Sequence, residues 1–104
     1  IATINIHHQL FKETYSGENP ESYHNGDSWY FINNITAISL HRLDKNLYKK
    51  YINKILKSST DDILYNGFIG YASELSSAKE QSSEASLAQA WSVATYIELV
   101  HELF

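Results

Sequence analysis

The stretch Asn66-Gly67-Phe68-Ile69-Gly70-Tyr71-Ala72-Ser73-Glu74 separates two parts of the chain that carry helical patterns. Its two glycines and its lack of a sustained helical or alternating period predict a loop. The apolar run from Leu87 to Phe104 follows. Because catalytic side chains tend to lie on loops held by rigid elements, Glu74 is the candidate functional residue. Its carboxylate can take a proton from water if a second carboxyl group faces it.

Upstream of this loop the sequence predicts two longer helices. From Trp29 to Leu43 apolar residues cover more than one face, which is typical of a helix surrounded by other helices. Asp44 is a candidate N-cap for the next helix, in which apolar residues recur at helical spacing and lysines cover much of the remaining surface. That pattern indicates an outer helix, half buried and half solvated.

A short helix and a third long one complete the predicted elements. Ser58 to Asp62 is expected to begin a new, short helix over about 61–65, and Asn66-Gly67 is expected to end it. The serine-rich segment 76–86 is expected to be a mobile surface loop, and Leu87 to Phe104 to form the last helix. No strand is needed, so the fold class is all-α, with three main helices and one short helix.

The segment Tyr23-His24-Asn25-Gly26-Asp27-Ser28-Trp29 gathers aromatic, imidazole, amide and glycine groups before the first helix. Asn25-Gly26 favours a positive-φ turn, and Asp27 or Ser28 can cap the helix. One interpretation is a capped helix entry with a core tryptophan. The other is a sugar platform, since carbohydrates are bound by flat apolar faces together with amide or imidazole groups.

Composition narrows the function classes. An apolar fraction of 43% and a charged fraction of 19% indicate a folded chain, and 104 residues allow at most one domain. The net charge of −4 argues against nucleic-acid binding. No cysteine is present, so thiolate metal sites and disulfides are excluded. No run reaches the length of a membrane span, no signal peptide is visible, and a cytoplasmic location is the simplest expectation. Nothing indicates a metal or organic cofactor.

Three motifs in this order carry a family resemblance: Tyr23-His24-Asn25-Gly26 with Trp29, then Ala72-Ser73-Glu74, then Ala88-Gln89-Ala90-Trp91-Ser92. From roughly Pro20 onward the chain resembles the C-terminal end of glycogen debranching enzymes with amylo-α-1,6-glucosidase activity. The resemblance implies the last few helices of an (α/α)6 toroid. Residues 1–104 are then a single partial domain, with 1–22 as an N-terminal lead-in.

The same resemblance implies site roles and partners. Glu74 matches the general base of an inverting hydrolysis of glycogen or a branched α-glucan, and the general acid belongs to the remainder of the parent glucosidase domain. His24, Asn25 and Trp29 would line the glucose pocket. Gln89 and Trp91 would touch the sugar or buttress the Glu74 loop. For Trp91, simple packing on the last helix is an equal alternative.

An inverting glycosidase needs two carboxyl groups, one as general acid and one as general base. Because this chain supplies only the general base, we expect the isolated chain to be inactive. Helices left open on one side are expected to drive association into a homo-oligomer or an exchange of helices. A second function class remains open, namely a non-catalytic helical assembly or carbohydrate-binding module. Glucan binding by the isolated chain would favour the module.

Overall fold

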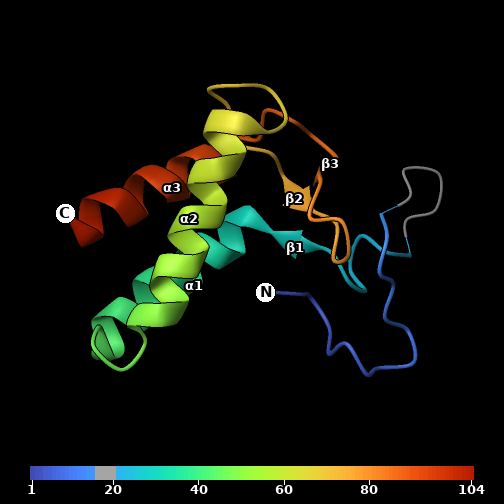
Figure 1. Cartoon of the computed structure of the whole chain (residues 1–104), viewed down its shortest axis with the longest axis horizontal. Coiled ribbons are helices and arrows are strands. Elements are labelled where there is room, and N and C mark those ends of the chain that lie inside the picture. Colours follow the sequence, from blue (N-terminus) through green and yellow to red (C-terminus); the bar gives the residue numbers. More distant parts are fainter. Residues whose placement is uncertain (16–20) are drawn as a thin grey trace.

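A computed structural model describes residues 1–15 and 21–104, so 16–20, which belong to the predicted lead-in, lie outside the described part. Three helices make up one side of the molecule: α1 (Tyr30–Asp44), α2 (Lys49–Tyr65) and α3 (Ala90–Leu103). Residues 1–15 and 21–27 and three two-residue strands make up the other side (Figure 1). The fold is therefore mostly helical, as predicted.

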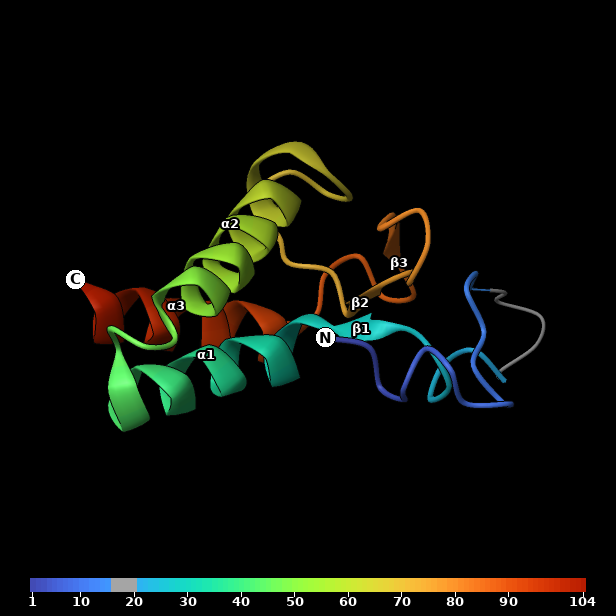
Figure 2. The same cartoon turned by 60° about the horizontal axis from the view of Figure 1, so that its bottom comes forward.

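The helices enclose a small core. Figure 2 shows α1 beside α3, with α2 crossing above them. Buried Ala37 of α1, Ile52 and Ile55 of α2, and Leu99 of α3 form one apolar cluster. Beside it, the fully buried Asn34 joins all three helices: its Oδ1 accepts from the Ser59 hydroxyl at 2.7 Å, and its Nδ2 donates to the Ser92 carbonyl at 3.4 Å. The apolar and polar contacts together hold the helices in one arrangement.

The predicted break between the second helix and a short helix is wrong. Helix α2 runs without interruption to Tyr65. The hydroxyls of Ser59 and Thr60 do not cap a new helix, because they bond to Asn34 of α1 and Tyr96 of α3. The predicted end is confirmed, since Asn66 follows the last helical residue and Gly67 has a φ of +52°.

The expectation that no strand is present is also wrong. Strands β1 (Ser28–Trp29), β2 (Leu75–Ser76) and β3 (Ser83–Glu84) form an antiparallel sheet in the order β1-β2-β3. Trp29 lies opposite Leu75, which in turn lies opposite Glu84. Much of the predicted mobile loop 76–86 is therefore part of a hydrogen-bonded hairpin. Because β2 also pairs with β1, the hairpin holds the segment that ends at Glu74 against the start of α1.

Two local predictions before α1 also fail. The N-cap of α1 is Trp29, and no side chain caps it. Instead, the Ser28 hydroxyl accepts from the Asn33 amide at 2.8 Å, and Asp27 is fully buried. Gly26 is not among the positive-φ residues. Position 26 requires a glycine because the backbone there lies close to Lys12: an added Cβ would lie 1.9 Å from the Lys12 carbonyl oxygen.

Candidate active site around Glu74

Glu74 lies at the junction between the helices and the small sheet. It directly precedes β2, and its carbonyl accepts from the Tyr30 N–H, at the start of α1, at 3.2 Å. Its own N–H donates to the Ser86 carbonyl at 2.8 Å, beyond β3. The side chain is half buried. The backbone of Glu74 is thus fixed from both sides, as a positioned carboxylate requires.

Both carboxylate oxygens of Glu74 have a partner. The Tyr23 hydroxyl donates to Oε1, and the Ser86 N–H donates to Oε2 at 3.2 Å. The hydrogen bond to Glu74 is the main reason why the pKa of Tyr23 rises to about 12, with burial and the negative charge of Glu74 acting in the same direction. A carboxylate oxygen has two acceptor positions, so each oxygen of Glu74 keeps one position that these two donors do not occupy.

An aromatic cluster extends from Tyr23. Its ring lies edge-on to Trp29 with centroids 4.7 Å apart, and His24 stacks on Trp29 with an interplanar angle of 11° and centroids 5.6 Å apart. Phe31 of α1 contacts Trp29 at 5.9 Å and Trp91 of α3 at 5.5 Å. Edge-to-face and offset contacts of this kind stabilise ring positions. The cluster therefore connects the Tyr23–Glu74 hydrogen bond to the entry of α3.

The six residues predicted from the sequence do not all converge. Trp29 and His24 lie in the aromatic cluster with Tyr23, and the Trp29 Nε1–H donates to the Tyr23 carbonyl at 3.0 Å. The Asn25 amide is used locally, because it donates to the Glu21 carbonyl at 2.7 Å.

The third motif meets the Glu74 segment through the main chain. The Gln89 N–H donates to the carbonyl of Ala72, two residues before Glu74, at 2.8 Å. The Trp91 ring contacts that of Phe31 in the cluster, and Trp91 is 64% exposed. The main chain of this motif thus lies beside the Glu74 segment, and the roles expected for the Gln89 and Trp91 side chains stay predictions.

The sequence reasoning missed Asp62. Its carboxylate is fully buried at the end of α2, where Oδ2 accepts from the Ser73 N–H at 2.7 Å and Oδ1 accepts from the Ser83 hydroxyl. These bonds hold the residue before Glu74 and the first residue of β3. The negative charge of Asp62 adds to burial, the larger cause, in raising the pKa of the neighbouring Tyr30. Asp62 therefore anchors both the segment that leads into β2, which carries Glu74, and the start of β3.

A signal for Asp62 was present in the sequence. The buried residues of α2 are Ile52, Ile55, Ser59 and Asp62, which recur at helical spacing. That spacing continues through the segment predicted to restart the chain. An acidic residue on the buried face of a helix requires a donor partner, which is how this position could have been found.

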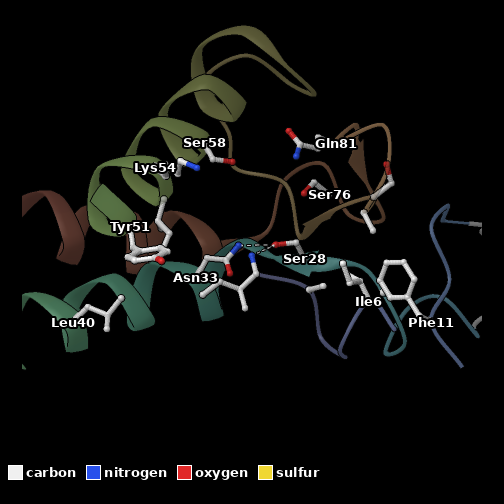
Figure 3. A pocket seen from close by; sticks show the side chains of 16 residues that line it. Ile6, Phe11, Ser28, Asn33, Leu40, Tyr51, Lys54, Ser58, Ser76 and Gln81 are labelled. Atoms are coloured by element: carbon white, nitrogen blue, oxygen red, sulfur yellow. Dashed lines mark hydrogen bonds between the residues drawn. The ribbon is translucent and has the colours of Figure 1, made fainter. Parts of the chain in front are cut away.

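A cavity lies elsewhere in the described part of the chain. Its volume is about 570 Å³, and none of the six predicted site residues lines it. Figure 3 shows Asn33 and Ser28 near its middle, with Tyr51, Lys54 and Ser58 of α2 on one side and Ser76 and Gln81 of the hairpin region on another. The Glu74 site is thus separate from this cavity.

Within residues 1–15 and 21–104, no group of three or more histidine and carboxylate side chains is arranged to hold a metal ion. In the same part of the chain, each helix is too short or too polar to cross a bilayer.

Comparison with known proteins gave one match. Residues 1–98 match the family model described as amylo-alpha-1,6-glucosidase. No curated protein and no solved structure matches the chain. The match begins at residue 1 and thus includes the lead-in, which the motif resemblance had left out.

Proposed function

The chain belongs to the amylo-alpha-1,6-glucosidase family, and from that membership we propose that it is the C-terminal segment of a glucosidase domain in which Glu74 is the general base. The substrate is the α-1,6 branch linkage of a glycogen-like glucan. The reaction is hydrolysis with inversion. The part of the domain outside this chain supplies the general acid and closes the helical ring.

The observation that supports this proposal is the environment of Glu74. A general base must be held still and must keep a free acceptor for the proton of water. Glu74 has a fixed backbone and receives one donor on each carboxylate oxygen, from Tyr23 and from Ser86. The stacked rings of His24 and Trp29 offer apolar faces to the C–H side of a glucose ring.

The two fully buried aspartates are poor candidates for the missing acid. Both carboxylate oxygens of Asp62 accept hydrogen bonds from the loop. Burial raises the pKa of Asp27 to about 6, against the opposing influence of Ser22, as a general acid would need, but Asp27 is fully buried and so cannot reach a bound glucan. Inverting hydrolysis needs two carboxyl groups about 6.5–9.5 Å apart with water between them. We therefore place the acid in another part of the ring.

The test is the Glu74→Gln variant in the complete glucosidase domain, assayed for glucose release from a branched dextrin. We expect kcat to fall at least 10²-fold with KM changed less than about threefold, because a general base contributes about 10²–10⁴. The matched control is Glu80→Gln, an exposed carboxylate near the same hairpin, which should leave kcat unchanged. Proton NMR of the first product should show β-glucose.

Retained activity in Glu74→Gln, or α-glucose as the first product, would refute the mechanism. The isolated chain should release no glucose, so activity that depends on Glu74 in this chain alone would refute the role of an external acid. A non-catalytic carbohydrate-binding module stays the alternative. It predicts equal activity for the parent domain and Glu74→Gln, together with glucan binding at the aromatic cluster.

We also propose that the isolated chain self-associates. Large apolar side chains are exposed on two adjacent helices, namely Ile32 and Ile35 of α1 and Trp91 and Ile97 of α3. Exposed apolar patches of this kind promote association in soluble proteins. Sedimentation equilibrium should give a mass above that of the monomer at high protein concentration, and a monomer mass throughout would contradict the proposal.

A further inference from the structure

Two residues of the hairpin region have a backbone conformation that side chains disfavour. Among the described residues other than glycine, Gln81 and Ala85 have a positive φ, of +56° and +60°. In this left-handed region the Cβ lies too close to the following carbonyl oxygen, and alanine has no polar side chain that could compensate. Such a conformation persists only where the surrounding structure holds it, and residues of this kind cluster at functional sites. The backbone of Ala85 therefore calls for a reason.

The reason lies in the pairing of β2 with β3 (Figure 1). Leu75 lies opposite Glu84. A regular ladder would therefore place the next residue, Ala85, opposite Glu74. Instead, the Glu74 N–H donates to the Ser86 carbonyl at 2.8 Å. One extra residue thus follows β3, and Ala85 occupies the position of a β-bulge that glycine commonly takes in this conformation. Bulges disrupt the ladder locally and change the direction in which nearby groups point.

The bulge brings the Ser86 N–H to the side chain of Glu74. This N–H donates to Oε2 at 3.2 Å, so Ser86 bonds to both the backbone and the carboxylate of Glu74. The other oxygen, Oε1, accepts from the Tyr23 hydroxyl, which belongs to the segment before α1. The carboxylate is therefore held between two donors from different segments. Because hydrogen bonds to an ionised acceptor are about twice as strong as neutral ones, these bonds offset the cost of the Ala85 backbone.

We propose that Ala85 is a positioning residue for Glu74. Its left-handed backbone directs the Ser86 N–H at Oε2, which fixes the orientation of the carboxylate and the acceptor positions that stay open to the attacking water. Ala85 acts through Ser86 and not by contact with the substrate. This inference rests on the proposed role of Glu74 as general base, and it identifies what orients that base.

The kinetic test uses the complete glucosidase domain and a branched dextrin. Valine is β-branched and disfavours a positive φ more strongly than alanine does, so Ala85→Val should release the Ser86 N–H from the carboxylate. Because a misplacement of about 1 Å can cost about 10²-fold in rate, we expect kcat to fall at least about tenfold, with KM changed less than about threefold. Ala85→Gly keeps the bulge without strain and should keep kcat within about twofold of the parent.

Gln81→Val is the matched control. Gln81 has nearly the same φ and lies in the same hairpin, but its N–H donates to the Ser77 carbonyl at 3.1 Å and not to Glu74. Its urea midpoint should fall as that of Ala85→Val does, while its kcat should stay within about twofold of the parent. Equal kcat values for the two valine variants would overturn the proposal. A loss of activity in Ala85→Gly as large as in Ala85→Val would overturn it as well, because the conformation would then not be the cause.

NMR of the chain itself tests the contact without relying on activity or on the folding of a valine variant. The amide proton of Ser86 should shift as Glu74 ionises, because this N–H faces the carboxylate, and Glu74→Gln should abolish the shift. Ala85→Gly should retain it. A Ser86 amide that does not respond to Glu74 would sink the role of Ala85. Full activity of Glu74→Gln with dextrin would instead refute the general base and leave the amide shift to decide the role of Ala85, so the two failures are distinguishable.

Discussion

Replacing Asp62 tests the claim that one buried carboxylate holds the loop that carries Glu74. In Asp62→Ala the Ser73 N–H and the Ser83 hydroxyl lose their acceptor. Ser73 is 1% exposed, so water cannot easily replace the lost partner. A buried donor left unsatisfied costs about 1–3 kcal/mol, which applies in full to the Ser73 N–H and only in part to the half-buried Ser83 hydroxyl.

Part of that cost is offset in the variant. Removing a fully buried charge recovers its desolvation penalty, which opposes the loss of the hydrogen bonds. We therefore expect the free energy of unfolding to fall by about 2 kcal/mol, a large share of the roughly 5–15 kcal/mol typical of folded domains. Asp62→Asn keeps one acceptor oxygen and should lose about half as much.

The neighbouring aspartate is the matched control. The Asp61 side chain is 37% exposed and pairs with Lys57 one turn earlier on α2. Exposed pairs of this spacing contribute about 0.3–0.5 kcal/mol, so Asp61→Ala should change stability by less than 1 kcal/mol.

Urea unfolding followed by circular dichroism measures both variants. Hydrogen exchange should show faster exchange of the amides of residues 72–86 in Asp62→Ala, while the amides of α1 and α3 keep their protection. If Asp62→Ala and Asp61→Ala lose the same stability, or if the loop amides keep their protection, the assignment of Asp62 as the anchor of this loop is wrong.

Three further predictions concern residues near the site. The raised pKa of Asp27, about 6 against an ordinary 3.8, means that its contribution to stability is present below about pH 4 and is lost as the pH rises through 6. Asp27→Asn should therefore raise the urea midpoint at pH 7 and remove this pH dependence, and an unchanged dependence would contradict it. The pKa of Tyr23, about 12, means that its contribution is lost between about pH 10 and 12. Tyr30 also titrates late, so absorbance titration at alkaline pH should lose one of its late-titrating tyrosines in Tyr23→Phe, and that tyrosine should titrate earlier in Glu74→Gln. Gly26→Ala should destabilise more than Gly70→Ala, because the first places a Cβ 1.9 Å from the Lys12 carbonyl oxygen while the second meets only the strain of a φ of +88°. Comparable urea midpoints for these two variants would count against the close approach.

The sequence by itself determined the helical parts with regular periods. The pattern from Trp29 to Leu43 predicted α1 to within one residue at each end, and Asn66-Gly67 predicted the end of α2. A helix buries a face whose residues recur locally, so its signal lies within one stretch of sequence. The same local reading identified the loop that carries Glu74.

Only the tertiary structure decided the strands and the partners of Glu74. Each strand is two residues long, too short for an alternating pattern, and β1 pairs with a segment more than forty residues later in the chain. The Tyr23–Glu74 hydrogen bond spans 51 residues, and the buried acceptor Asp62 meets Ser73 and Ser83 only after the hairpin folds back on α2. Contacts of this kind depend on how the elements pack, because hydrogen bonds between distant segments leave no period in the sequence.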